Sequence, residues 1–394
     1  MIIGGHGMVK QKKTTNEDAI VIQEDKIKSE KKHNGIISFW KFMFCILIVL
    51  HHSFVLAKEG ETPLFFKGSI GVEFFFLVSG YLLAKKALQK NNNNNESLGK
   101  ETIQYIWKKY KIFLPYTICA GIIAIALINI MNTKNSLYNT ITSIYEIFLL
   151  RMAGFKGFVL NGSTWYISSM LMCMIILYPL IRKYKDKFLK LVAPVILIIG
   201  FGIFSKYYTH LRNPEKWLGL TYKGNIRAFL ELLLGAELYL ICEKLKKIDF
   251  TKFGKIFITL VEIGCFIIPF LLSHFVIKSA KLDYITLIII SLGVVLAFSE
   301  QTLEYKLFNN RVFYWLEKLS LPIYILHMPL RFYFENAAWT SSFSYYQIMA
   351  LYVPLVLSSS IILMYIVEYF KEKHFYLNKF KNLIIENEVE TNGK

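Results

Sequence analysis

Several apolar runs of this 394-residue chain are interrupted by side chains that could do chemistry. The first run contains Lys41, His51 and His52. On a helix, Lys41 and His52 share one face and lie about 16 Å apart along the axis, whereas His51 points about 100° away from His52. The ordinary pKa of histidine, about 6.5, suits His52 to accept and return a proton. In the alternative interpretation, Lys41 snorkels at one membrane interface and the histidines lie at the other.

A second run, 69–87, contains a single acid, Glu73, between Gly71 and Gly80. A carboxylate in an apolar helix needs a cation, a hydrogen-bond donor or a proton. The glycines allow close contact with another helix. Glu73 is therefore a candidate functional group, although a hydrated rim position would also explain it.

Two later runs carry polar groups near their first residues. The run 164–182 begins with Thr164, Trp165, Tyr166 and Ser168. The run 225–242 has Arg227 and Glu231 one turn apart, which predicts an ion pair along one helix face. An interfacial aromatic belt and a purely structural ion pair are the alternatives for these two runs.

The run 318–335 contains a polar stripe. Its polar residues follow the i, i+4, i+7, i+11 spacing of one helix face: Ser320, Tyr324, His327 and Arg331. Pro322 and Pro329 predict a bend in the same helix. Ionisable groups in apolar helices are costly and usually functional, so the stripe indicates a binding or catalytic site. In the alternative interpretation, His327 is a core residue satisfied by one hydrogen bond.

Membrane helices are expected to hold these groups in place. Hydrophobic residues make up 54% of the chain and charged residues 19%, against about 25% charged in an average soluble domain. A bilayer core about 30 Å thick needs roughly 20 apolar residues per helix. About ten runs qualify: 36–57, 69–87, 112–131, 164–182, 189–205, 225–242, 254–273, 282–299, 318–335 and 347–370. The sequence predicts an all-α, polytopic integral membrane protein.

Loop charge predicts the orientation of these helices. Lysines are concentrated after the second, fourth, sixth and tenth runs. By the positive-inside rule, both termini then lie in the cytoplasm. We expect a mobile cytoplasmic tail at 1–34, a membrane domain at 35–370 and a cytoplasmic tail at 371–394. The expected location is the plasma membrane, as a multi-pass protein.

Charge and cysteine content exclude other classes. The formal net charge is +18, but the lysines lie between apolar runs, so we expect no nucleic-acid partner. The five cysteines are scattered and contain no CxxC spacing. We therefore expect neither a disulfide framework nor a metal site.

In combination, these segments resemble the integral-membrane acyltransferase family 3. That family has an Arg, ten residues and a His on its first helix, and here Lys41 and His52 occupy those positions. Its second helix carries Gly-Val-Asp/Glu-x-Phe-Phe-x-x-Ser-Gly, which residues 71–80 match, and a basic stretch ending in Pro precedes its third helix, as in 108–115. Later family positions follow in order at Trp165, Ser168, Arg227, Gly235 and the run from Ser320 to Pro329.

The likeness spans about residues 35–370. Many members have Glu where Met170 stands, and this chain is similar to a Trp-Tyr-x-Ser-x-Met branch without an appended esterase-like domain. The resemblance implies an O-acyltransferase that moves an acyl group, with acetyl as the expected one, from cytoplasmic acyl-CoA to a hydroxyl of a cell-surface polysaccharide or related glycan. No permanently bound cofactor is implied, because acetyl-CoA or another acyl-CoA is the donor substrate. The implied partners are acyl-CoA, the glycan acceptor and the lipid bilayer.

The resemblance also implies residue roles. We expect His52 to act as general base and Glu73 to orient it. The cations expected to hold the CoA phosphates are Lys41, Lys108, Lys109 and Lys111. The residues expected to line the acceptor pocket or stabilise an oxyanion are Ser168, Arg227, Tyr324 and His327.

Two other functions fit the residues alone. A transporter or exporter of glycans or lipid-linked sugars would also have ten spans, polar stripes and prolines. A membrane sensor or scaffold is the third possibility. No inverted repeat supports the transporter, and no signalling module stands in the loops.

Overall fold

The protein is all-helical in the computed structural model, which describes residues 34–89, 97–131, 135–275, 281–303 and 305–392. The predicted tail at 1–34 lies outside these residues, apart from Asn34. The main helices are α2 (Gly35–His52), α3 (Gly71–Gln89), α4 (Leu98–Ile130), α5 (Ser136–Ile147), α6 (Thr164–Lys187), α7 (Ala193–Tyr207), α8 (Lys223–Leu245), α9 (Lys252–Phe275), α10 (Leu282–Phe298), α12 (Arg311–Asn336) and α13 (Tyr345–Asn392). Short turns of helix include η1 (Ser53–Leu56), η2 (Gly68–Ile70), η3 (Arg151–Ala153), η4 (Phe188–Val192), α11 (Tyr305–Phe308) and η5 (Ala338–Ser342).

Each of the ten predicted apolar runs lies on one of these helices. Among the residues that the structure describes, six segments are long and apolar enough to cross a membrane: Gly35–Leu56, Gly68–Gln89, Leu98–Ile130, Thr164–Tyr207, Lys252–Phe275 and Tyr345–Lys373. The α10 helix is apolar but shorter, and α8 and α12 carry the charged residues singled out above. The predicted all-α membrane protein is therefore confirmed, whereas the number of crossings and the side of the termini stay predictions.

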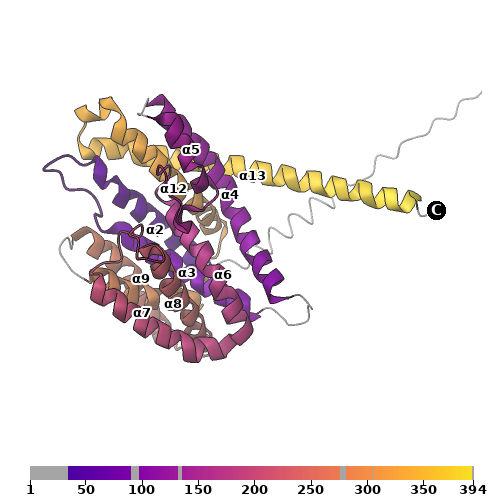
Figure 1. Ribbon diagram of the computed structural model, residues 1–394. Coiled ribbons are helices and arrows are strands. Elements are labelled where there is room, and N and C mark those ends of the chain that lie inside the picture. The colour runs from indigo at the N-terminus through magenta and orange to yellow at the C-terminus, as the bar shows by residue number, and fades with distance from the viewer. Residues whose placement is uncertain (1–33, 90–96, 132–134, 276–280, 304, 393–394) are drawn as a thin grey trace, which may run out of the picture.

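The segment 164–207 contains two helices rather than one. Lys185 has a left-handed backbone (φ 47°), and a π-helical turn follows at Phe188–Val192. Figure 1 shows the ribbon turning back between α6 and α7 at this point. Two predicted runs, 164–182 and 189–205, correspond to these two helices. The predicted tail at 371–394 is helical as far as Asn392, because α13 continues beyond the bundle (Figure 1).

The helices run in alternate directions, which gives the bundle two distinct ends. At one end, here called the histidine end, the last residue of α2 is His52, and Lys67 N before α3 donates to Ser273 O of α9 (3.1 Å). At the other, the lysine end, Asn34 Nδ2 before α2 donates to Ala297 O of α10 (2.8 Å). Starts of some helices thus meet ends of others, as expected for a chain that crosses back and forth.

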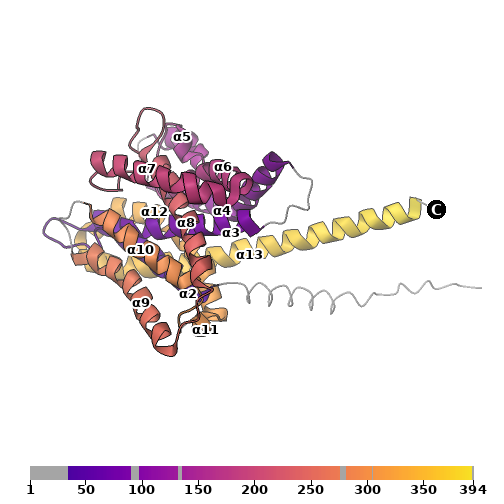
Figure 2. The ribbon, with the colours of Figure 1, turned by 90° about the horizontal axis from the view of Figure 1, so that it is seen from below.

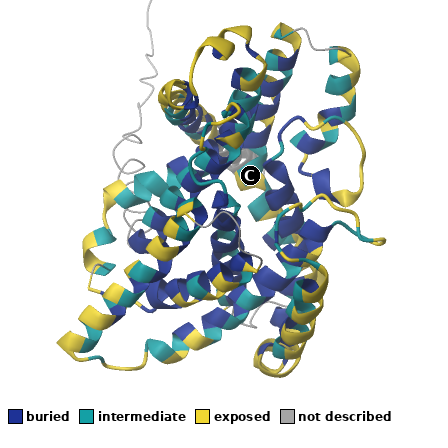
Figure 3. Cartoon of the chain, turned by 90° about the vertical axis from the view of Figure 1, so that its left-hand side faces the viewer, coloured by how far each residue is buried: buried dark blue, intermediate teal, exposed yellow. Residues whose placement is uncertain are grey.

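Helices α3 and α8 form the centre of the bundle. A Cβ atom at Gly80 would lie 2.0 Å from Leu232 O, and one at Gly235 would lie 2.2 Å from Leu77 O. Only glycine permits this approach, which confirms the predicted role of Gly80 in close helix contact. Figure 2 shows α3 and α8 with α6 on one side and α10 on the other, and Figure 3 shows buried residues toward the inside of the bundle and exposed residues toward its outside.

Candidate active site

Two histidines from distant parts of the sequence meet at the histidine end. His52 is the last residue of α2, and His327 lies within α12. Their ring centroids are 5.3 Å apart. His327 is fully buried, His52 is half-buried, and the ring of Tyr324 lies 5.8 Å from that of His327. The structure therefore brings together three of the residues that the sequence singled out.

The protonation of His327 follows from its neighbours. Its Nδ1 lies 3.3 Å from the carbonyl oxygen of Ile323, and a carbonyl can only accept a hydrogen bond. In the neutral ring the proton is then on Nδ1, which leaves the lone pair on Nε2. Nε2 has no hydrogen-bond partner among the described residues. The hydroxyl of Tyr352 on α13 donates to the His327 carbonyl (2.9 Å) and fixes this turn of α12.

Glu73 is part of a buried charge cluster. Its Oε1 lies 2.9 Å from Nη2 of Arg227, and Nε of Arg227 lies 2.7 Å from Oε1 of Glu231. All three side chains are at most 2% exposed, and the guanidinium also lies over the ring of Trp165. The predicted i,i+4 pair of Arg227 and Glu231 is confirmed.

This cluster bears on the expected roles of Glu73 and Arg227. In the described part of the chain, Glu73 makes no hydrogen bond to His52, because its Oε1 faces the guanidinium of Arg227 instead. Arg227 is engaged by two carboxylates and donates from Nη1 to Leu211 O (3.3 Å). The cluster joins α3 to α8. Among the described residues, its hydrogen bonds and ion pairs do not include His52 or His327.

The hydroxyls of Ser168 and Tyr324 both contact the segment that precedes α6. Ser168 Oγ accepts from Met152 N (3.0 Å), and Tyr324 OH donates to Ser163 O (2.9 Å). Both side chains are buried. They hold the 152–163 segment against α6 and α12.

A cavity of about 410 Å³ extends from the lysine end toward Tyr324. Its charged wall is formed by Lys41, Lys109, Lys318, Lys371, Glu317 and Glu368, and Tyr166 and Tyr324 line it as well. The remaining wall is mostly apolar and includes Phe75, Leu82 and Met170. We call this the lysine cavity. Lys41 is paired with Glu317, and Lys318 Nζ lies 2.9 Å from Glu368 Oε1. Four lysines against two carboxylates leave its charged wall net positive.

The predicted lysine cluster of the third helix divides between two faces of α4. Lys109 lines the cavity, whereas Lys108 and Lys111 are exposed and do not line it. Lys111 lies over the ring of Trp107, 5.5 Å from its centroid. Lys108 and Lys111 lie about 100° and 200° around the helix from Lys109, so one helix cannot direct all three inward.

Sequence reasoning missed four charged residues of this cavity: Glu317, Lys318, Glu368 and Lys371. Glu317 precedes Ser320 by three residues and thus continues the polar stripe of α12, a signal that was present in the sequence. Glu368 and Lys371 stand at the end of the last apolar run, where lysines are expected at any membrane interface. No sequence pattern distinguished them.

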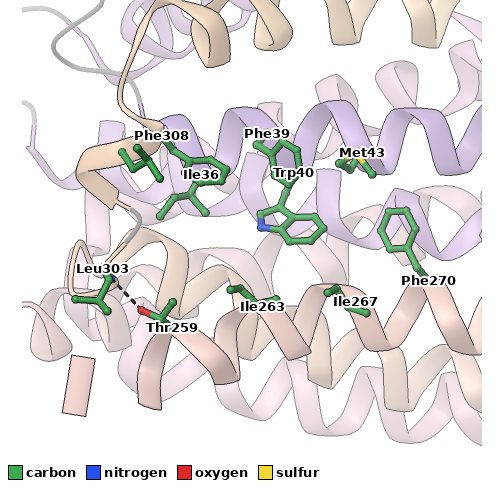
Figure 4. Close-up of a pocket in the computed structure, with 11 residues that line it drawn as sticks. Ile36, Phe39, Trp40, Met43, Thr259, Ile263, Ile267, Phe270, Leu303 and Phe308 are labelled. Carbon is green, nitrogen blue, oxygen red and sulfur yellow. Dashed lines mark hydrogen bonds between the residues drawn. The ribbon is translucent and has the colours of Figure 1, made fainter. Parts of the chain in front are cut away.

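A larger cavity, about 650 Å³, lies between α2, α9 and α11. Figure 4 shows that its walls are hydrocarbon, from residues such as Phe39, Trp40 and Ile263. Thr259 contributes a hydroxyl, but its Oγ1 accepts from Leu303 N (2.9 Å), which Figure 4 marks with a dashed line. This cavity offers no group for acid–base chemistry, so size alone does not identify the active site.

Comparison with known proteins identifies a family that the chain matches. The model of the acyltransferase family 3, described as an acyltransferase domain, matches residues 34–369. No curated protein and no solved structure matches the chain. The matched range agrees with the 35–370 expected from the motifs, so the resemblance to the family is confirmed, whereas the Trp-Tyr-x-Ser-x-Met branch stays a prediction.

Proposed function

The chain belongs to acyltransferase family 3, and from that premise we propose that it transfers an acyl group, acetyl in the simplest case, from cytoplasmic acyl-CoA to a hydroxyl of a cell-surface polysaccharide or related glycan. The plasma membrane is the proposed location. One observation carries the proposal: a single cavity extends from four lysines to Tyr324, whose ring lies beside that of His327.

The lysine cavity suits an acyl-CoA donor. The phosphates of CoA are anionic, and lysines attract them as point charges without the fixed fork of an arginine. Lys41 and Lys109 are the proposed phosphate ligands, and Lys318 and Lys371 add to the positive field. The apolar wall would contact the pantetheine arm and the acyl chain, and Met170 contributes to that wall.

The histidine pair supplies the proposed base. His52 takes the proton from the acceptor hydroxyl while the oxygen attacks the thioester carbonyl, which gives a tetrahedral oxyanion. As the intermediate collapses, the C–S bond breaks and the CoA thiolate takes the proton back from the imidazolium. The products are the O-acyl glycan and free CoA. His327, with its Nε2 lone pair unused, is the proposed neighbour that receives a hydrogen bond from the acceptor.

The other predicted residues act more indirectly in this proposal. Glu73, Arg227 and Glu231 hold α3 against α8 and thereby fix the walls of the site. Tyr324 lies at the inner end of the lysine cavity, where the donor is proposed to bind. Ser168 holds the segment that leads into α6.

The O-acetyl content of extracted surface glycans tests the proposed function. It is compared in cells with the native chain, with no chain, and with His52→Ala at matched membrane levels. We expect acetate to fall in both the null and the His52→Ala cells. If acetate is unchanged while glycan accumulates inside the null cells, the chain is an exporter and the proposal fails.

A further inference from the structure

A second polar cavity, about 200 Å³, lies at the histidine end beside the segment that leads into α6. It is lined by residues of α5, η3 and the two neighbouring loops, including Tyr145, Arg151, Phe155, Lys156, Glu215 and Tyr222. We call it the aromatic cavity. None of these residues belongs to the lysine cavity or the histidine pair, so the aromatic cavity is a separate feature of the molecule.

The buried arginine of the aromatic cavity is paired. Arg151 is 5% exposed and contacts two carboxylates, Glu146 and Glu215, the latter at 2.6 Å from Nη2. Burial raises the pKa of Glu146 to about 7, although Arg151 opposes this. Lys156 supplies a second cation to the lining. Arg151, Lys156 and Glu215 line the cavity, and Glu146 pairs with Arg151 from behind its wall. The buried arginine thus has two carboxylate partners, in contrast to the excess of lysines over carboxylates in the lysine cavity.

Hydrogen-bonding capacity remains in this cavity. Arg151 Nε has no hydrogen-bond partner in the residues that the structure describes, and Glu215 is half-exposed. Aromatic surface stands beside these groups, since the rings of Tyr145 and Phe155 lie 5.7 Å apart and Phe155 is 53% exposed. A small concave site with a few convergent polar groups among aromatic rings is the usual form of a ligand site.

A sugar fits this combination of groups. The C–H face of a pyranose is apolar and packs on an aromatic ring, while its hydroxyls both donate and accept. Glu215 offers an acceptor and Arg151 a donor, as charged partners that strengthen hydrogen bonds. A phosphate or uronate would meet the carboxylate of Glu215 beside an arginine that two carboxylates already pair.

We propose that the aromatic cavity binds an uncharged sugar unit of the acceptor glycan, with its ring against Phe155 and Tyr222 and its hydroxyls on Arg151 and Glu215. The inference rests on the proposed function and adds to it a place and a charge class for the acceptor. It assigns a binding subsite for a unit near the acylated one, and the reacting hydroxyl remains at the histidine pair.

The position of the cavity supports this assignment. Glu146 Oε2 accepts from Leu160 N (3.0 Å) and Asn161 N (2.7 Å) behind the cavity. Asn161 Nδ2 then donates to Ile325 O (2.8 Å), two residues before His327. One short segment therefore contacts both the charged cluster of the cavity and the turn of α12 that carries the proposed acceptor histidine.

The test uses the purified full chain in detergent and, as probe, surface glycan from its own cells after base removal of O-acetyl groups. Phe155→Ala and Glu215→Gln are compared with Phe148→Ala, a matched control because Phe148 is also about half exposed but does not line the cavity. Glycan binding is measured without acetyl-CoA, and transfer is measured with it.

We expect both cavity variants to weaken glycan binding and to raise KM for the glycan about tenfold, with kcat and KM for acetyl-CoA unchanged. Phe148→Ala should behave like the native chain. Binding of the native chain should change little between about 50 and about 500 mM salt, because an uncharged ligand is not screened. A steep loss of binding with salt would contradict the uncharged class.

The two proposals fail in different ways. If the native chain transfers acetyl and the cavity variants keep native KM and glycan binding, the subsite is wrong and the proposed function stands. If the native chain binds glycan through the cavity but transfers no acyl group, the proposed function is wrong and the binding site stands. If the native chain neither binds nor acylates the glycan, both are overturned.

Discussion

The cations at the two ends of the bundle are held in opposite ways. At the histidine end, Arg227 contacts Glu73 and Glu231, and Arg151 contacts Glu146 and Glu215. At the lysine end, four lysines line one cavity with only two carboxylates, and Lys41 and Glu317 keep 19% and 31% of their side-chain surface exposed.

This difference shows which cations are available to a ligand. A buried guanidinium away from water must be paired, and two carboxylates leave it little capacity for a new anion. Partly exposed lysines in excess over carboxylates keep a positive field that an incoming phosphate can neutralise. The lysine end is thus suited to bind an anionic donor, whereas the arginines of the histidine end are already paired and are poor ligands for an anion.

The largest effect is expected from removing the buried cation of Arg227 at the histidine end. Arg227→Ala would leave Glu73 and Glu231 buried without their cation, which typically costs about 3–5 kcal/mol of folding free energy. We expect a strongly lowered melting temperature and little folded protein in detergent. Lys109→Ala is the control at the other end and should melt like the native chain. A native melting temperature for Arg227→Ala would show that the cluster does not hold α3 against α8.

A smaller effect is expected from removing one unbalanced cation. Lys109→Ala should raise KM for acetyl-CoA about tenfold at low salt, because one phosphate contact is worth roughly 1.4 kcal/mol. Lys108→Ala, one residue away but exposed outside the cavity, should leave KM unchanged. Steady-state kinetics at low and high salt check both. Equal effects of the two variants would mean that general surface charge, not the cavity, attracts the donor.

The smallest expected effect is a decrease in KM for acetyl-CoA, from a substitution at Glu317. Glu317 pairs with Lys41 and so competes with an incoming phosphate for that cation. Glu317→Gln should therefore lower KM for acetyl-CoA a few-fold, by less than about 1 kcal/mol, since a partly exposed pair is weak. The affinity of the purified variant for CoA, measured by calorimetry, decides the point. Weaker CoA binding would show that Glu317 positions Lys41 rather than restraining it.

The sequence alone predicted the helices and the shared helix face of two site residues. Apolar length located ten helices, and the 3.6-residue period placed Tyr324 and His327 on one face of α12. The short helix α5 escaped because its 12 residues form no membrane-length apolar run. Helix phase would also have separated Lys109 from Lys108 and Lys111.

The remaining features of the site depend on contacts between helices. Glu73 was expected to orient His52. It instead pairs with Arg227, which lies on a helix about 150 residues later in the chain. A buried carboxylate pairs with whichever cation the packing brings near, and no spacing within one run reveals that choice. The lysine cavity has walls from α2, α3, α4, α6, α12 and α13, so its shape follows only from the assembled bundle.

We propose that the lysine end binds the donor and that the histidine pair performs the transfer. The most direct test measures, on one preparation of purified protein, both the affinity for acetyl-CoA and the rate of acyl transfer to deacetylated surface glycan. We predict that His52→Ala binds acetyl-CoA like the native chain but transfers nothing, and that Lys109→Ala binds it more weakly yet reaches the native rate at saturating acetyl-CoA. A His52→Ala protein that still transfers acyl groups, or that has lost acetyl-CoA binding while correctly folded, would contradict this division.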